Sequence, residues 1–366
     1  MPHTYNILNH IPADVACLDD YSRYAREHLP DSFWHYINGA GADGISKQRN
    51  RQCFADIVLK PLVLSGVQLP DTTCSLFSQQ PFKEHHSQPF MLAPVAYQKL
   101  CHPDGEIATA QAASAQDVAM VLSTLSSQPL KDVAAFKGAA AQWFQLYIQV
   151  EPSATFDLIK KAELAGYSAL VITVDALING LRNAEQRSGF CLPEHISAIN
   201  IADYQQPTAQ SLAQCLAQAP SWQTIKEIKA QTKLPIILKG ILSVADALKA
   251  QQLGVAGIVV SNHGGRVLDT VASPIEQIAA IRHAVGDDFT LLLDSGIRRG
   301  SDIFKALALG ANSVLIGRPL MYSLASAGPL GVAHMIRILK DELAFTMAMC
   351  GCNNLAEITQ DCLQNK

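Results

Sequence analysis

The sequence predicts an α/β protein folded as a (β/α)8 TIM barrel. Short, almost continuously apolar runs recur along the chain, each run ends in a polar residue or a glycine, and segments with helical periodicity separate the runs. An apolar run without alternation is typical of a parallel strand that is covered on both faces. Eight strand and helix units without an interruption favour a closed barrel, whose active site lies at the carboxyl ends of the strands.

The predicted strands begin only after the first quarter of the chain. They cover residues 89–94, 119–124, 142–147, 169–175, 235–240, 257–262, 290–295 and 313–318. An open, doubly wound sheet is the alternative arrangement. However, no Gly-x-Gly-x-x-Gly fingerprint follows a first strand, which weakens the case for a dinucleotide-binding fold.

The segments between these strands carry the start signals of amphipathic helices. Ser243 can cap the helix in "SVADALKAQQLG". In "SPIEQIAAIRHAV", Ser273 and Glu276 form a capping box, with Pro274 at the first helical position. These signals support an alternation of strands and helices.

Two regions depart from the regular alternation. Residues 1–85 are expected to form a helical and irregular N-terminal extension, with "FWHYINGAGADG" as its most unusual piece. Residues 180–222 form a long, polar excursion between the fourth and fifth strands. This excursion is either a lid over the active site or a variable surface loop. We treat residues 1–366 as a single domain.

The bulk composition excludes several classes of protein. A formal net charge of −4 gives no general attraction to nucleic acid or to an anionic membrane. The N-terminal sequence lacks the pattern of a secretory signal, and no apolar run is long enough to span a bilayer. The nine scattered cysteines do not have zinc-site spacing. We expect reduced thiols and a cytoplasmic protein.

The sixth predicted strand is followed by the run "SNHGGR". His263 lies next to Gly264 and Gly265, which allow a ligand to approach the backbone, and Arg266 is suited to bidentate binding of a carboxylate. A lone histidine is most often structural, but this combination favours a functional residue.

Charged residues also follow the fourth and fifth strands. Asp175 could orient an imidazole and stabilise its protonated form, or it could be an ordinary cap. Arg182 and Arg266 would form a clamp for one carboxylate if they converge, and the alternative places each of them in a surface ion pair. Lys239 follows an apolar strand, where its charge would suit an electron-rich cofactor ring.

The last two strands end in glycine and arginine. In this fold the loops after strands seven and eight frequently hold a phosphate on backbone amides and a helix N-terminus. Gly296, Arg298, Gly317 and Arg318 supply amides and positive charge at that place. The sequence therefore predicts a phosphate site there.

Together, the ordered motifs resemble the FMN-dependent 2-hydroxy acid oxidase and dehydrogenase family, which includes glycolate oxidases, lactate oxidases and mandelate dehydrogenases. The resemblance covers roughly residues 15–360. Its motifs are "YINGAGAD", "LAPVAYQKLCHPDGE", "LSTLS", "WFQLY", "TVDALINGLR", "LPIILKG", "VSNHGGR", "LLDSGIRRG" and "IGRP".

The resemblance implies a catalytic and substrate-binding set. His263 would be the base that takes a proton from the substrate hydroxyl or α-carbon, with Asp175 as its partner. Arg182 and Arg266 would bind the carboxylate. Two tyrosines would hydrogen-bond the carboxylate and hydroxyl oxygens, namely Tyr36 and Tyr147. The substrate side chain would face Tyr97 and Leu125.

The resemblance also implies FMN as cofactor and assigns residues to each part of it. The flavin ring would contact Val95, Ala96, Ser123, Gln145, Thr173, Lys239 and Ser261. Lys239 would stabilise negative charge on the reduced ring. The ribityl chain and phosphate would contact Asp294, Ser295, Gly296, Arg298, Gly317 and Arg318.

Departures from the family pattern bear on the substrate. Ala40, Gly44 and Val267 differ from the usual residues next to the matched motifs. Leu125 stands where glycolate oxidases have tryptophan, which argues against glycolate and leaves room for lactate or a larger, even aromatic, side chain.

The expected reaction is oxidation of an (S)-2-hydroxy acid to the 2-oxo acid, with O2 as the acceptor and hydrogen peroxide as a product. The alternatives are a quinone-dependent dehydrogenase, a lactate-type monooxygenase, and a barrel that binds flavin without turnover. The resemblance also implies a homotetramer.

Overall fold

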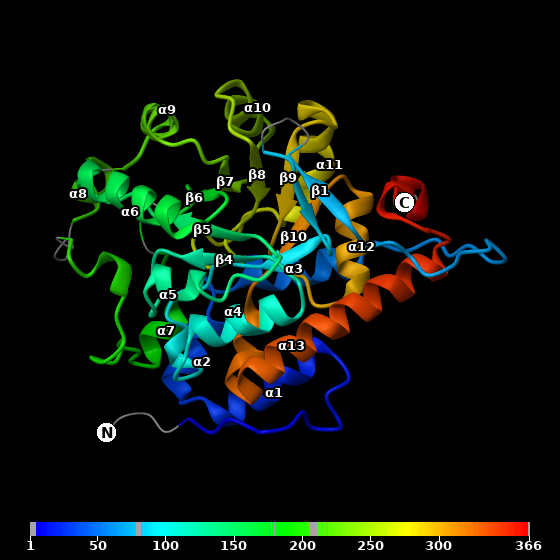
Figure 1. The fold of residues 1–366 in the computed structure, drawn as a ribbon, viewed down its shortest axis with the longest axis horizontal. Helices are drawn as coiled ribbons and strands as arrows, with labels where there is room; N and C mark the ends of the chain where they lie inside the picture. Colours follow the sequence, from blue (N-terminus) through cyan, green and yellow to red (C-terminus); the bar gives the residue numbers. More distant parts are fainter. Residues whose placement is uncertain are drawn as a thin grey trace.

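The computed structural model describes residues 5–364 apart from 78–81, 177, 179, 205–210 and 218. Its central feature is a closed barrel of parallel strands (Figure 1). The barrel strands are β3 (Phe90–Leu92), β4 (Met120–Ser123), β5 (Gln142–Leu146), β6 (Leu170–Thr173), β7 (Ile236–Ile241), β8 (Gly257–Val260), β9 (Thr290–Leu293) and β10 (Ser313–Ile316). They follow one another around the barrel in chain order, and β10 pairs with β3 to close it. The predicted (β/α)8 barrel is confirmed.

Each barrel strand coincides with a predicted run, and among them only β7 extends past its run, to Ile241. The pairing register between β7 and β8 shifts between Lys239 and Ile241. Gly240 lies there at φ 115°, and a Cβ on it would lie 2.5 Å from Cβ of Asp175. A glycine is therefore required at this bulge, because any side chain would displace Asp175.

Helices surround the barrel between the strands. They are α4 (Glu106–Ala115), α5 (Leu130–Ala134), α6 (Pro152–Ala165), α9 (Trp222–Gln231), α10 (Val244–Gln252), α11 (Pro274–Val285), α12 (Gly300–Ala308) and α13 (Arg318–Met349). Both predicted start signals are confirmed, since Ser243 accepts a hydrogen bond from the N–H of Asp246 and α11 begins with the Ser273 and Glu276 capping box. Helix α13 is kinked at Ala327 and Gly328, directly before Pro329.

The N-terminal extension contains three helices and a hairpin. The helices are α1 (Leu18–His28), α2 (Asp31–Asn38) and α3 (Ile45–Ala55), and the hairpin strands are β1 (Cys74–Leu76) and β2 (Glu84–His86). The expectation of helical and irregular structure missed the hairpin, because strands of three residues are too short to show a periodic pattern.

The hairpin covers the amino end of the barrel. The Glu84 carboxylate accepts hydrogen bonds from Nε1 of Trp143 at 2.8 Å and from the Ser168 hydroxyl at 2.7 Å. The Phe77 N–H donates to the hydroxyl of Thr290, the first residue of β9. Leu76 and Phe77 join the apolar barrel interior. Apolar side chains therefore fill the interior at that end of the barrel.

Helix α3 is fixed to the loop that follows β8. The Asp269 carboxylate accepts hydrogen bonds from the N–H groups of Asp43, Ile45 and Ser46, at the start of α3. The side-chain amides of Asn50 and Asn262 each donate to the other at 2.8 Å, and both are buried. Elsewhere in the extension, α1 packs against α13 (Figure 1).

The excursion between the fourth and fifth barrel strands contains α7 (Asn183–Arg187), the 3-10 helix η2 (Ile199–Ile201) and α8 (Leu212–Ala217). Residues 205–210 and 218 of this excursion, for which a lid and a variable surface loop were the two expectations, lie outside the described part of the chain. Two short 3-10 helices follow α13, and another, η1 (Gln98–Leu100), follows β3. Among the described helices, none is long and apolar enough to cross a membrane.

We expect Asp269→Ala to weaken the attachment of α3. Three backbone N–H groups would lose their carboxylate acceptor, which should destabilise the fold by about 1–2 kcal/mol, as for the loss of a helix cap. Thermal unfolding should show the midpoint about 1–3 °C lower. Asp203→Ala, an exposed aspartate, serves as the control and should leave the midpoint unchanged. Equal midpoints for both variants would contradict this role.

Candidate active site

A cavity of about 570 Å³ opens at the carboxyl ends of the barrel strands. The predicted site residues that line it are Tyr36, Val95, Ala96, Tyr97, Ser123, Leu125, Tyr147, Arg182, Lys239, His263, Arg266, Asp294, Ser295, Gly296, Arg298, Gly317 and Arg318. Its size is in the range of small-molecule sites. The remaining predicted residues, Gln145, Thr173, Asp175 and Ser261, lie behind this wall.

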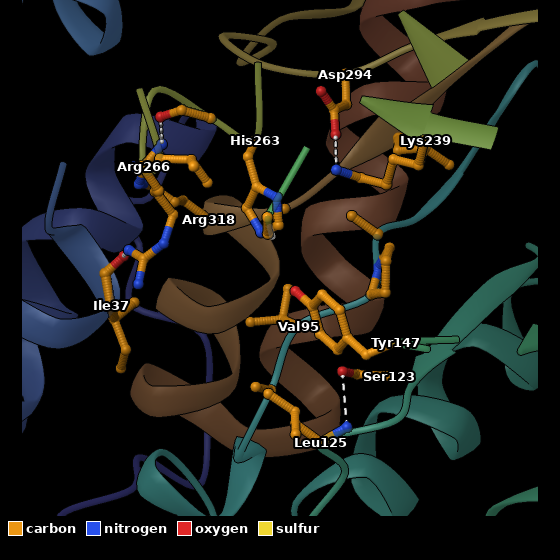
Figure 2. Close-up of a pocket in the computed structure, with 18 of the residues that line it drawn as sticks. Ile37, Val95, Ser123, Leu125, Tyr147, Lys239, His263, Arg266, Asp294 and Arg318 are labelled. Atoms are coloured by element: carbon orange, nitrogen blue, oxygen red, sulfur yellow. Dashed lines mark hydrogen bonds and ion pairs between the residues drawn. The ribbon is translucent and has the colours of Figure 1, made fainter. Parts of the chain in front are cut away.

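His263 and Asp175 form a hydrogen-bonded pair, with Nδ1 of the imidazole 3.0 Å from Oδ1 of the carboxylate. A carboxylate can only accept, so Nδ1 carries the proton, and in the neutral ring Nε2 keeps its lone pair. Figure 2 shows the imidazole of His263 in the middle of the view. Arg266 and Arg318 lie on one side of it, and Lys239 and Asp294 lie on the other. The ring is therefore prepared to accept a proton on Nε2.

Burial lowers the pKa of His263, and the charge of Lys239 acts in the same direction against the opposing effect of Asp175. Burial alone would raise the pKa of Asp175, but the neighbouring His263 outweighs it and lowers that pKa. The resulting state at neutral pH is a neutral imidazole beside an ionised carboxylate. This is the state that a general base requires.

The backbone of the loop after β8 explains the two glycines of "SNHGGR". His263, Gly264 and Gly265 have φ values of 57°, 68° and 69°. A Cβ on Gly264 would lie 2.9 Å from Nη1 of Arg318, and one on Gly265 would lie 2.6 Å from the backbone nitrogen of Lys47. Both glycines are needed for the left-handed turn and for close packing, while His263 carries the strain of a non-glycine residue there.

Lys239 is 4% exposed and is held by two partners. Its Nζ lies 3.1 Å from Oδ2 of Asp294 (Figure 2). The same Nζ donates to the Ser261 hydroxyl at 3.0 Å. Burial acts to lower the pKa of Lys239, but Asp294 and Asp175 outweigh it and raise that pKa. A permanently charged ammonium thus faces the cavity.

Arg182 and Arg266 both line the cavity but use different partners. Nη1 of Arg182 lies 3.3 Å from Oε2 of Glu185. Its Nε is buried and has no hydrogen-bond partner among the described residues. Nη1 of Arg266 donates to the carbonyls of residues 36, 37 and 39. A buried donor without a partner requires an acceptor from a ligand, and a carboxylate is the matching group.

The loops after β9 and β10 bring Arg298 and Arg318 to the same cavity. Arg318 donates from Nη1 to the carbonyl of Gly264 and from Nη2 to the carbonyl of Gly39, and its buried Nε has no partner among the described residues. Gly317 is the N-cap of α13. Buried guanidinium groups at the N-terminus of a long helix form an anion site.

Aromatic and aliphatic side chains form the wall opposite the charged groups. Tyr36 stacks on Phe190 with ring centroids 4.4 Å apart and lies 6.4 Å from Tyr97. The N–H of Tyr97 donates to the carbonyl of Leu125, which couples the loops after β3 and β4. Burial raises the pKa of Tyr36 and of Tyr147, so both hydroxyls stay protonated donors.

The predicted residues behind the wall support those that line it. Oε1 of Gln145 accepts a hydrogen bond from the Ser123 hydroxyl, and its Nε2 donates to the Thr173 hydroxyl. The Ser261 hydroxyl accepts from Nζ of Lys239 and from the N–H of His263. These contacts fix the orientation of the side chains that reach the cavity.

Sequence reasoning missed several residues of the site. Glu185, Phe190 and Ile201 come from the excursion after β6, and they contact or line the cavity. Asp269, which lies just beyond the run "SNHGGR", was also assigned no role. Its carboxylate three residues after Arg266 was an available signal, whereas nothing in the sequence placed the excursion residues.

The barrel and its site define an enzyme that holds an anionic cofactor and an anionic substrate at the carboxyl ends of the strands. Comparison with known proteins specifies the class. The family described as FMN-dependent dehydrogenase matches residues 25–365, and the chain belongs to this family. It is therefore an FMN-dependent enzyme.

Individual relatives agree with this assignment. An L-lactate oxidase of Roseobacter sp. (strain GAI101) is 43% identical over 354 residues, which cover 94% of each chain. Glycolate oxidase 1 of Zea mays is 38% identical, with 95% of each chain covered. A crystal structure of mandelate oxidase with (S)-2-phenylpropionate has a TM-score of 0.86 at 38% identity and covers 96% of this chain and 98% of its own.

The residues present fit FMN. The unpartnered Nε of Arg318 and the N-terminus of α13 at Gly317 provide an anion cradle for a phosphate. The buried ammonium of Lys239 supplies a positive charge at the bottom of the cavity. These features are what a cofactor with an anionic tail and an electron-accepting ring requires.

The rate of flavin reduction by substrate should depend on the ionisation of His263. Because burial lowers its pKa, the base form persists to low pH, and kcat/KM should rise with pH with a midpoint below the ordinary value of 6.5. Stopped-flow reduction between pH 4.5 and 8 measures this midpoint, and a midpoint at or above 7 would contradict it. In Asp175→Asn the midpoint should move lower still, because Asp175 raises the pKa of His263, and the rate should fall by on the order of a hundredfold or more.

Proposed function

We propose that this protein oxidises an (S)-2-hydroxy acid with a lactate-like or larger side chain to the corresponding 2-oxo acid. Bound FMN supplies the two-electron chemistry, accepting electrons from the substrate and passing them to O2 to give hydrogen peroxide. The observation that carries the proposal is the His263 and Asp175 pair, which lies in one cavity with unsatisfied arginine donors and a buried lysine. The names of the relatives, L-lactate oxidase, glycolate oxidase and mandelate oxidase, support the substrate class and the acceptor.

His263 acts as the base. Its Nε2 takes a proton from the hydroxyl or the α-carbon of the substrate, and the Asp175 carboxylate at 3.0 Å stabilises the imidazolium that forms. Lys239 already carries a positive charge nearby, which disfavours the protonated imidazole and favours release of the proton afterwards. The pair can therefore both accept and return a proton.

The arginines bind and orient the substrate. The free Nε of Arg182 and the remaining donors of Arg266 hold the carboxylate from two loops, so the molecule has one orientation relative to His263. The hydroxyls of Tyr36 and Tyr147 donate to the carboxylate and hydroxyl oxygens. The ion pair with Glu185 already engages Nη1 of Arg182, and this limits the orientations that the Arg182 guanidinium can adopt.

The cofactor contacts follow the layout of the cavity. The lining residues assigned to the flavin ring are Val95, Ala96, Ser123 and Lys239, which Gln145, Thr173 and Ser261 support from behind the wall. Those assigned to the ribityl phosphate are Asp294, Ser295, Gly296, Arg298, Gly317 and Arg318. In this assignment Asp294 has two tasks, since it also neutralises Lys239 at 3.1 Å. Tyr97 and Leu125 face the side chain of the substrate.

We also propose that the protein is a cytoplasmic homotetramer. The segment between α3 and β1 projects from the barrel (Figure 1) and exposes apolar side chains. Leu64 is 101% exposed, Leu69 90% and Val63 86%. An exposed apolar segment of this kind is typical of an association surface. The described cysteines form no disulfide, which supports a reducing compartment.

Substrate and acceptor can be tested in the two half-reactions. Anaerobic enzyme should lose its flavin absorbance on addition of (S)-lactate or (S)-mandelate, and air should then give one hydrogen peroxide per flavin. Failure of every 2-hydroxy acid in a panel of small, aliphatic and aromatic acids would contradict the proposal. Much faster reoxidation by a quinone would indicate a dehydrogenase, and acetate in place of pyruvate from lactate would indicate a monooxygenase.

His263→Ala is the matched variant for this experiment. FMN should stay bound, while reduction by substrate should fall by about 10²–10⁴-fold, the usual contribution of a general base. His195→Ala, an exposed histidine of the excursion, should reduce normally. Bound FMN with no reduction in the wild type would instead indicate a barrel that binds flavin without turnover.

The assembly can be tested by light scattering after size exclusion. We expect four times the chain mass of 39.5 kDa for the wild type. Leu64→Glu should lower this mass, because it places a charge in the projecting segment. Leu164→Glu, at an 80% exposed leucine of α6, is the control and should not change it. A monomeric wild type would contradict the tetramer.

A further inference from the structure

The C-terminal end of α2 is held by positively charged side chains. Nζ of Lys47 donates to the carbonyl of Asn38 at 2.6 Å and to its Oδ1 at 2.9 Å. Nη2 of Arg318 donates to the next carbonyl, that of Gly39, at 2.7 Å, and Nη1 of Arg266 also reaches Gly39 at 3.2 Å. The ammonium of Lys47 and the guanidinium of Arg318 thus bind consecutive carbonyls of the chain.

These cations are poorly neutralised. Within the described part of the chain, neither Lys47, Arg266 nor Arg318 has an ion pair with a carboxylate, and Arg298 has only Asp19 at 3.4 Å. Carbonyl oxygens provide partial charges, not a full negative charge. Several like charges in one region of low dielectric repel each other strongly, so an anion bound there would be stabilised by all of them.

Lys47 is the member of this group that can release its charge. A lysine changes its protonation state readily when it is buried, whereas a guanidinium does not. Burial, together with the charges of Arg318, Arg298 and Arg266, lowers the pKa of Lys47 to about 7. Near neutral pH the ammonium is therefore partly deprotonated.

We propose that Lys47 is a third cation of the FMN phosphate site, beside Arg298 and Arg318, and that it takes up a proton when the cofactor binds. Lys47 lies behind the cavity wall, so it acts on the phosphate through its charge. It also acts through its hydrogen bond to the carbonyl of Asn38, which precedes the Gly39 carbonyl that Arg318 binds. The proposal rests on FMN binding by this family and not on the proposed substrate. It assigns a role to a residue outside all the motifs described above.

Among the charged groups around it, Lys47 is the one whose protonation state changes near neutral pH. The titratable or charged groups on the elements around it are Tyr36 of α2, His263, Arg266 and Asp269 of the loop after β8, Asp294 and Arg298 of the loop after β9, and Arg318 and Tyr322 of α13. Asp269 is committed to backbone N–H groups of α3, and Asp294 to Lys239. The hydroxyl of Tyr322 donates to Oδ1 of Asn38. None of these carboxylates forms an ion pair with Lys47 among the described residues.

The sign of the linkage follows from these charges. A phosphate dianion favours protonated Lys47, so its pKa is higher with the cofactor than without it. Below pH 7 Lys47 carries its proton in both states, and its contribution to FMN affinity is constant. Above pH 7 the empty site must first bind a proton, so the affinity falls as the pH rises, by up to about tenfold per pH unit for one proton.

The test measures the dissociation constant of FMN from the diluted enzyme, by the fluorescence of released flavin, between pH 6.0 and 8.5. Four proteins are compared, namely the wild type, Lys47→Met, Lys47→Arg and Lys305→Met. Lys305 is a suitable control because its Nζ also donates to a helix-end carbonyl, that of Phe54 at 2.7 Å, away from the cavity. Burial also lowers the pKa of Lys305.

We expect the Kd of the wild type and of Lys305→Met to increase from pH 7 to pH 8.5. Lys47→Met should bind FMN at least several-fold more weakly at pH 6, and this difference should shrink as the pH rises. Lys47→Arg stays charged, so it should bind FMN with little pH dependence. This variant keeps the test decisive even if Lys47→Met folds poorly.

Two results would overturn the proposal. One is a Kd of Lys47→Met within twofold of the wild type at every pH, and the other is an equal rise of Kd with pH in the wild type and Lys47→Arg. No substrate is present in these measurements. A protein that fails to oxidise any 2-hydroxy acid would therefore still give a clear answer about Lys47.

Discussion

The attachment of the N-terminal extension to the loop after β8 is the contact on which the rest of the site depends. The Asp269 carboxylate holds the start of α3, and the paired amides of Asn50 and Asn262 hold its interior. The same attachment brings the end of α2 against Arg266, whose Nη1 binds three of its carbonyls. Tyr36 therefore reaches a cavity that belongs to the barrel, although it lies far from the barrel strands in sequence.

The second constraint is charge. The barrel provides buried cations at one rim, and its own carboxylates neutralise only part of them. Lys239 has Asp294 at 3.1 Å, whereas Arg318 binds only carbonyl oxygens among the described residues. An FMN phosphate and a substrate carboxylate are the groups that would complete this balance. This imbalance provides affinity for both ligands. Burial, together with the charge of Lys239, lowers the pKa of His263 and keeps it neutral as a base.

Much of the fold was predictable because barrel strands are covered on both faces and read as apolar runs. The polar residues after those runs were predictable for the same reason, since parallel strands bring their carboxyl ends to one rim. The hairpin β1 and β2 was missed because its strands have three residues each and no period. Phe190 of the excursion and the extra cation Lys47 were missed because their spacing along the chain carries no signal of where they pack.

The sequence by itself determined the barrel, the order of its chemical groups and the run "SNHGGR", because these depend on local patterns of burial and on residue types within a few positions of a strand end. Only the tertiary structure decided which groups meet. The pairing of His263 with Asp175 across two strands, the glycine bulge at residue 240 that makes room for it, and the arrival of Tyr36 from α2 depend on contacts between distant segments. Such contacts are set by barrel closure and packing, which no local pattern encodes.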